Sequence, residues 1–418
     1  MRLFGATVGR VKNQSPGHVK SQNPHSKIAK GAILEWGTLR VLHGSGIEFA
    51  WRESLAIEAV DGEPELRIDE YLRRRLMPVE GAIPRLPGIE MYGGSIPAGT
   101  VGGDVFEYLN FQQRYDIDVR IARALRLSRE YLEPMAAGAT PQNYTDVHVR
   151  WMLSTGTFTA EDIAAYRKAK SWEQLRIAEN LKTLYLSAGV LLVDAQGHDL
   201  IAAKIASTVH DTFHAFMLSE LDANGTITAD LFEKLNLRLA HSVTARNALG
   251  RRTDAESREI ATMLYGEILP SGHFRFVDFG HPPPLVFSAE YDRFMEIQRS
   301  GMVQFPALGL EIPEDHPDRN KYVSIGQRLR QMDLSDFSEI TLMGSGDILF
   351  LYTDGVYDGG DADDRHAIEA IVRTHKRESA KEICSAVLEY AVKRDTMLRE
   401  QGLGDEVDDK TVFVIKKM

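Results

Sequence analysis

Four aspartates, far apart in the sequence, stand where strands are predicted to end or beside glycines: Asp104, Asp194, Asp354 and Asp408. A single aspartate in such a place is most often a turn or helix-cap residue. Carboxylates that converge repel one another and raise each other's pKa, so a converged set requires divalent cations. Ligation by oxygen alone favours Mg or Mn over zinc. The pattern therefore predicts a site for hard divalent cations.

The stretch from Gly346 to Gly355 is the clearest of these four places. A Gly-Asp turn leads into the continuous apolar run 348–352, and Thr353-Asp354-Gly355 comes directly after it. A short apolar run bounded by turn residues is typical of a strand buried on both faces. Asp354 is then expected at the rim of the core, where Gly355 lets the backbone turn sharply.

Five short motifs occur in a fixed order along the chain: PAGTVGGD at 97–104, DAQGH at 194–198, GHPPPL at 280–285, LYTDG at 351–355 and DDKT at 408–411. Their order resembles the SpoIIE/RsbU branch of the PPM (PP2C-like) protein serine/threonine phosphatases. The resemblance runs from about residue 68 to the C-terminus. It implies an α/β fold, a layered α-β-β-α sandwich of the PPM phosphatase type, here with a helical insertion.

The resemblance also implies a site. Two Mn2+ or Mg2+ ions would be held by Asp104, Asp194, Asp354 and Asp408, with the backbone carbonyl of Ala195 as a further ligand. A water activated by the two metals would then hydrolyse phosphoserine or phosphothreonine on a signalling protein, with an anti-anti-sigma-type protein as one candidate. Asp409 is expected to orient the ligand loop.

The role of His198 stays open. It stands four residues after Asp194, as in this branch, and could donate a proton to the leaving group, whereas Asp199 comes next where the family usually has glycine. We expect Asp199 to cap the next helix. His281, in the GHPPPL motif, is expected to be a structural hydrogen-bonding residue.

Three functions fit the motifs. The first is an active metal-dependent phosphoprotein phosphatase, a hydrolase. The second is a catalytically silent module of the same fold that binds a phosphoprotein, and the presence of all four acids weighs against it. The third is a two-metal hydrolase of small phosphate esters. Turnover of p-nitrophenyl phosphate with and without Mn separates the first from the second, and activity on free nucleotides separates the first from the third.

Composition narrows the partners. The 418 residues carry a net charge of −11, which argues against nucleic acid as the main partner. The single cysteine, Cys384, excludes an internal disulfide and is expected to be buried on a helix. No signal segment opens the chain and no apolar run approaches the roughly 18 residues of a membrane helix, so a cytoplasmic protein without membrane contact is expected.

The predicted domains are a basic flexible tail at 1–30, a small extension at 31–67 and the phosphatase domain at 68–418. Within the last, about 112–183 reads as a helical insertion, either a regulatory or dimerising lid or a passive surface elaboration. A homodimer is therefore one alternative left open. The activating signal and the choice between Mn and Mg are not determined by the sequence.

Local patterns predict the remaining elements. Helices are expected over 68–77, 118–133, 201–216, 368–394 and from Asp230 to near 250, a hairpin over 261–279 and a closing strand over 412–415. Ser171-Trp172-Glu173-Gln174 has the form of a capping box, which predicts a helix beginning at Ser171.

Overall fold

The computed structural model describes residues 83–99, 101–197, 200–248, 260–297, 304–310, 337–357, 362–402 and 407–418. The chain divides into two units, Met1–Val60 and Asp61–Met418, and every described residue belongs to the second unit. The tail predicted for 1–30, the extension for 31–67 and the helix for 68–77 all lie outside the described residues.

The first sheet is five-stranded and antiparallel, in the order β1-β11-β10-β6-β7. Its central strand β10 is buried at every position, as the apolar run 348–352 predicted. The strand bounds are Ile89–Ile96 for β1, Leu285–Ser288 for β6, Arg293–Met295 for β7, Ile348–Tyr352 for β10 and Lys410–Lys417 for β11.

The second sheet is six-stranded, in the order β2-β3-β4-β5-β8, with β9 paired to β5. Its first three neighbouring pairs are antiparallel, and β8 runs parallel to β5. The bounds are Asp104–Leu109 for β2, Ala188–Ala195 for β3, Ala261–Ile268 for β4, His273–Phe279 for β5, Gln304–Phe305 for β8 and Ser338–Thr341 for β9.

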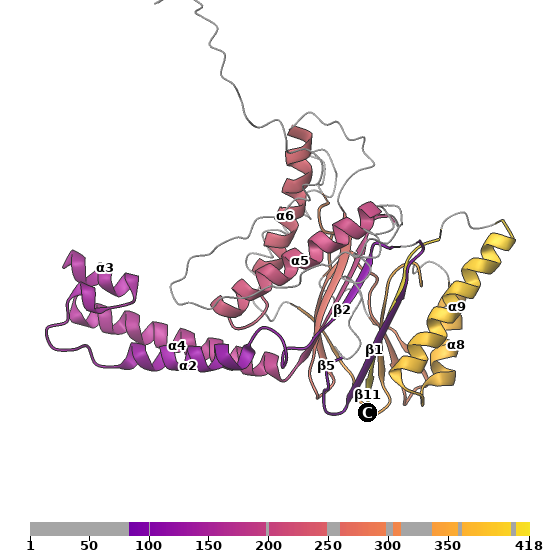
Figure 1. Cartoon of the computed structure of the whole chain (residues 1–418). Coiled ribbons are helices and arrows are strands. Elements are labelled where there is room, and N and C mark those ends of the chain that lie inside the picture. Colours follow the sequence, from indigo (N-terminus) through magenta and orange to yellow (C-terminus); the bar gives the residue numbers. More distant parts are fainter. Residues whose placement is uncertain are drawn as a thin grey trace, which may run out of the picture. The chain divides into compact units, whose positions relative to one another are not determined.

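Alternate residues of the strands face different cores. One cluster joins the two sheets through side chains such as Phe106, Leu192, Leu351 and Phe413. A second lies between the six-stranded sheet and the helices α5 (Leu200–Ala223) and α6 (Ala229–Ala248). A third joins the five-stranded sheet to α8 (Ala362–His375) and α9 (Ala380–Glu400). These clusters confirm the predicted α-β-β-α layering (Figure 1).

Residues 368–394 are mostly helical, as predicted, but they belong to two helices, α8 and α9, with a break between them. Ser379 is the N-cap of α9: its hydroxyl accepts from the backbone N–H of Glu382, whose carboxylate accepts from the backbone N–H of Ser379. This capping box satisfies amide groups at a helix start, so it stabilises a new helix there.

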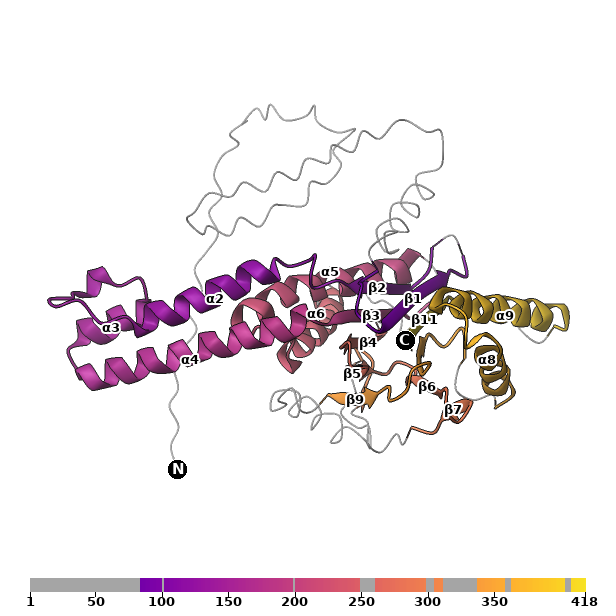
Figure 2. The same cartoon turned by 90° about the horizontal axis from the view of Figure 1, so that it is seen from below.

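Between β2 and β3 the chain forms α2 (Ile117–Leu132), the short 3-10 helix η1 (Pro141–Asn143), α3 (Val147–Thr155) and α4 (Ala160–Tyr185). The α2 and α4 helices lie side by side in both views (Figures 1 and 2). The capping box predicted at Ser171 is wrong, since Ser171 is buried in the middle of α4 and its hydroxyl lies 2.9 Å from that of Ser128. The helix begins instead at a capping box of Thr159 and Asp162.

Two smaller expectations can be compared with the structure. Cys384 is free and fully buried on α9, as predicted. Among the described helices, none combines the length and apolar character needed to cross a membrane.

Candidate metal-binding active site

Asp104 and Asp194 lie opposite each other, because β2 and β3 pair in the register Asp104↔Asp194. Directly opposed residues of an antiparallel pair point to the same face of the sheet with their Cβ atoms about 5 Å apart. That face is the one between the two sheets, since the residues two positions along each strand, Phe106 and Leu192, belong to the inter-sheet core. Two carboxylates from distant motifs thus meet at one edge of the sandwich.

Two threonines from the other sheet bind Asp104. The hydroxyls of Thr353, after β10, and Thr411, in β11, each donate to Asp104 Oδ2 at 2.7 Å. Because Tyr352 pairs with Val412, β10 ends and β11 begins at the same edge. The loops that carry Asp354 and Asp408 therefore come to the edge where Asp104 and Asp194 meet.

Asp409 fixes the backbone of the first loop. Its Oδ1 accepts from the N–H of Ala98 at 2.6 Å and its Oδ2 from the N–H of Gly103 at 2.5 Å. A Cβ on Gly103 would lie 2.5 Å from the carbonyl oxygen of Ala195, and one on Gly355 would lie 2.0 Å from the carbonyl oxygen of Asp409. Only glycine permits these approaches, so four motif loops pack together closely.

The electrostatics show the acids acting on one another. Burial raises the pKa of Asp104 well above its usual range, and the charge of Asp194 raises it further. Burial also raises the pKa of Asp194 to about 8, with the charges of Asp354 and Asp408 adding to the effect. Protons or cations must compensate this much buried negative charge.

The two outer acids are more accessible. Asp354 and Asp408 are exposed, whereas Asp104 is buried and Asp194 is half-buried. In the part of the chain that the structure describes, no three of these carboxylates bring their oxygens within 4.8 Å of one another.

The donor set fits hard divalent cations. It offers carboxylate oxygens and the carbonyl oxygen of Ala195, which the Gly103 backbone approaches closely. The pKa values of Asp104 and Asp194 are raised, and a bound cation would stabilise both carboxylates in the charged form. His198 and Asp199 lie outside the described residues, so their roles stay predictions.

His281 is buried at the end of β5. Its backbone N–H donates to Asp278 Oδ1 at 2.7 Å and its Nδ1 lies 2.9 Å from the hydroxyl of Thr262. Thr262 is the register partner of Asp194 on β4. These contacts are those of the structural residue that the sequence predicts.

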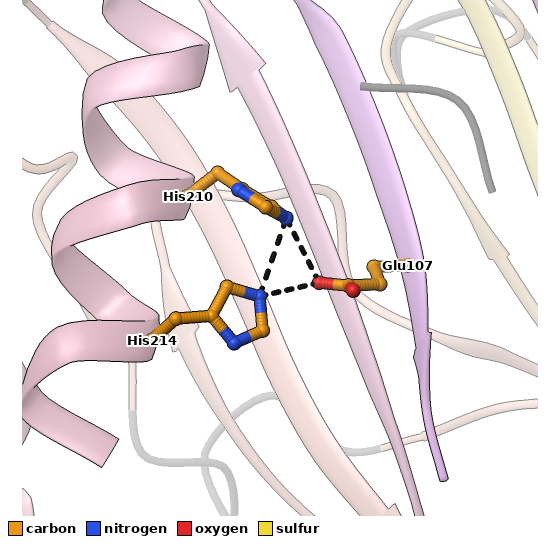
Figure 3. Close-up of side chains that lie close together, drawn as sticks. All are labelled: Glu107, His210 and His214. Carbon is orange, nitrogen blue, oxygen red and sulfur yellow. Dashed lines mark hydrogen bonds and ion pairs between the residues drawn. The ribbon is translucent and has the colours of Figure 1, made fainter. Parts of the chain in front are cut away.

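Sequence reasoning missed a second group of ligand-type side chains. Glu107 of β2 and His210 and His214 of α5 bring one ligand atom each within 4.8 Å of one another (Figure 3). The spacing of two histidines four residues apart on a predicted helix was a usable signal. Glu107 could not be assigned to them, because its position depends on how α5 packs on β2.

Comparison with known families gives a match to the family "Stage II sporulation protein E (SpoIIE)", over residues 187–330 and 338–417. These residues make up more than half of the chain and include Asp194, Asp354 and Asp408. No curated protein sequence matches.

Three solved structures that are similar to this chain come from bacteria. The RsbU and RsbW domains of Rv1364c from Mycobacterium tuberculosis match with 16% identity and a TM-score of 0.42, over 81% of this chain and 63% of that one. The PP2C domain and regulatory fragment of SpoIIE from Bacillus subtilis match with 13% identity and a TM-score of 0.40, over 79% and 64%. The SiaA-PP2C domain of Pseudomonas aeruginosa matches with 12% identity and a TM-score of 0.42, over 84% and 95%. This chain thus spans less than two thirds of the first two structures.

Proposed function

Because the chain belongs to the SpoIIE family, we propose that it is a metal-dependent protein serine/threonine phosphatase of the PPM type. The observation that supports this most is the assembly of four aspartates from both sheets at one edge of the sandwich, with Asp104 and Asp194 in direct register.

Asp104, Asp194, Asp354, Asp408 and the carbonyl of Ala195 would hold two Mn2+ or Mg2+ ions. Bound there, divalent ions would lower the pKa of a water and share the negative charge of the phosphate oxygens. The residues of the chain itself would hold the ligands in place. Thr353 and Thr411 hold Asp104 from the other sheet.

In our proposal, Asp409 positions the loops that carry the metal ligands and does not contact the substrate. Its two backbone hydrogen bonds to Ala98 and Gly103 join the loop before β11 to the loop before β2. Residues that orient ligands in this way commonly change metal affinity when they are replaced. We therefore assign Asp409 a positioning role.

The substrate we propose is a phosphoserine or phosphothreonine on a signalling protein, with an anti-anti-sigma-type protein as the first candidate on the family resemblance. The α2–α4 segment leaves β2 and enters β3, the two strands that carry Asp104 and Asp194. The segment joins these strands at the ends opposite Asp104 and Asp194, and we propose that it regulates the site through the strands.

The test is turnover of a phosphoserine-containing protein, p-nitrophenyl phosphate and free nucleotides, each with Mn2+, with Mg2+ and with EDTA. We expect metal-dependent release of phosphate from the protein and from p-nitrophenyl phosphate, with little from nucleotides. A folded, metal-loaded chain that binds the phosphoprotein without turnover would favour the silent binding module. Faster turnover of nucleotides than of phosphoprotein would favour a hydrolase of small esters.

A further inference from the structure

Three ligand-type side chains meet on the helix-covered side of β2, away from the aspartates. Glu107 Oε2 lies 3.0 Å from His210 Nε2 and 2.7 Å from His214 Nε2, and the two nitrogens are 3.2 Å apart. The histidines stand one turn apart on α5, so both reach the same strand residue (Figure 3).

The other polar atom of each side chain is held by a neighbour. His210 Nδ1 lies 3.3 Å from Asp211 Oδ1, His214 Nδ1 lies 2.6 Å from the Tyr115 hydroxyl, and Arg114 binds Glu107 Oε1. Partners of this kind on the outer nitrogen fix the tautomer and ring orientation of metal-binding histidines.

The protons on the rings are compatible with a site that an ion can enter. A carboxylate only accepts hydrogen bonds, so Asp211 Oδ1 and Glu107 Oε2 require protons on both nitrogens of His210 while no ion is bound. A bound cation would replace the proton on Nε2 and leave the proton on Nδ1. His210 Nε2, His214 Nε2 and Glu107 Oε2 would then form one ligand set, since the ligand atoms of these three residues lie within 4.8 Å of one another.

The spacing also fits. Ligand atoms about 2.0–2.1 Å from a tetrahedral zinc ion lie roughly 3.3 Å from one another. The observed separations of 2.7, 3.0 and 3.2 Å are close to this value and need only a small expansion around an ion. The side chains of His210, His214 and Glu107 are 16%, 21% and 11% exposed, which leaves access for an ion and a water as a fourth ligand.

We propose that Glu107, His210 and His214 form a second metal site, which takes a transition-metal ion of the zinc type. Imidazole ligands select such ions over Mg2+ and Ca2+, which require oxygen. A bound ion ties α5 to β2, and through Tyr115 it also holds the segment that leads into α2. The site is independent of the proposed phosphatase activity.

Without an ion, the same atoms form a cluster of hydrogen bonds and ion pairs between Glu107 and the two rings. In that state at least one ring must donate from both nitrogens and carry a positive charge. The two states differ in zinc content, which makes them separable by experiment.

The experiment uses the full chain, stripped of metal with a chelator and re-equilibrated with Zn2+ or Co2+, in an Asp354→Asn background that weakens binding at the aspartates. Bound metal is measured by mass spectrometry, and cobalt by its visible absorption. We expect one zinc per chain, and a cobalt spectrum of the strong tetrahedral type. His210→Ala and His214→Ala should each lower zinc affinity at least tenfold, whereas His375→Gln, a histidine of α8 paired with Glu378, should not.

Unchanged zinc affinity in folded His210→Ala and His214→Ala chains overturns the proposal. Should those variants fail to fold, X-ray absorption at the zinc edge of the chain without histidine substitutions decides it. Two imidazole nitrogens in the first coordination sphere support the site, and an all-oxygen sphere or an absence of bound zinc overturns it.

Discussion

The strand β2 separates two sites of opposite chemistry. Asp104, at its start, faces the other sheet and meets oxygen ligands only, whereas Glu107, three residues on, faces α5 and meets two imidazoles. Successive residues of a strand point to opposite faces, so an odd spacing of three places these acids on different sides. One strand can therefore serve a site for hard cations and a site for softer ones.

The pKa of a histidine ring also differs between the two sides of the six-stranded sheet. On the inter-sheet side, burial lowers the pKa of His281 to about 3, so its ring stays neutral. On the helix side, burial acts to lower the pKa of His210, but hydrogen bonds to Asp211 and Glu107 outweigh burial and raise it to about 9. The neutral His281 ring therefore adds no charge beside the aspartates. The His210 ring, which is surrounded by hydrogen-bond acceptors, becomes positively charged or binds a cation.

The largest expected effect is on the acid side. Replacing Asp354 by asparagine keeps the shape but removes a negative charge from the proposed ion site, so we expect activity to fall about a hundredfold or more. Turnover of p-nitrophenyl phosphate at limiting Mn2+ measures it, with circular dichroism to confirm folding. Asp230→Asn is the matched control, because Asp230 is an exposed aspartate at the start of α6.

Activity of Asp354→Asn within a fewfold of the unsubstituted chain would remove Asp354 from the ligand set. An equal loss in Asp230→Asn would show a general effect of charge.

The second effect is on stability. An ion that binds only the folded chain adds RT ln(1 + [L]/Kd), about 2.7 kcal/mol at a free ion concentration one hundred times Kd. We expect Mn2+ to raise the melting temperature of the EDTA-treated chain. Asp104→Ala, Asp194→Ala and Asp408→Ala should reduce that rise, and His214→Ala should keep it.

This set of variants sharpens the comparison between the two faces of β2. If His214→Ala loses the Mn2+ response as fully as Asp104→Ala does, the two sites are not independent. If all variants keep an equal response, Mn2+ binds elsewhere.

The strands of the site were predictable because each carries a strong local signal. The apolar run of β10 is buried at every position, and the 261–279 hairpin forms as β4 and β5. The glycines at 103 and 355 were also informative, since their neighbours leave no room for a side chain. The acids at strand ends could therefore be selected from 60 Asp and Glu residues in the chain.

Contacts between distant side chains were not predictable. Nothing local indicates that Thr353 and Thr411 bind Asp104, or that Glu107 meets His214, because these contacts depend on how layers pack. The predicted start of the helix at Ser171 was wrong for a related reason. The pattern at Ser171 matches a capping box, but burial against Ser128 of α2 places it inside α4.

The smallest effect concerns His281. In the unfolded chain its pKa returns to about 6.5, whereas in the folded chain it is about 3. As pH falls below 6.5, the unfolded chain takes up a proton that the folded chain refuses. The stability contributed by the neutral ring is thus complete above pH 6.5 and is lost as pH falls towards 3, by at most about 1.4 kcal/mol per pH unit.

Denaturant unfolding in EDTA between pH 7 and pH 5 measures this contribution. His281→Gln should lose less stability over that range than the unsubstituted chain, because the substituted chain lacks the ring whose pKa burial lowers. Parallel slopes for His281→Gln and the unsubstituted chain would contradict a buried neutral ring. If His281→Gln does not fold, NMR titration of the His281 ring in the unsubstituted chain gives a second measurement. A His281 ring that titrates near pH 6.5 would show that water reaches this side of the sandwich. The two faces of the six-stranded sheet would then differ less than the structure indicates.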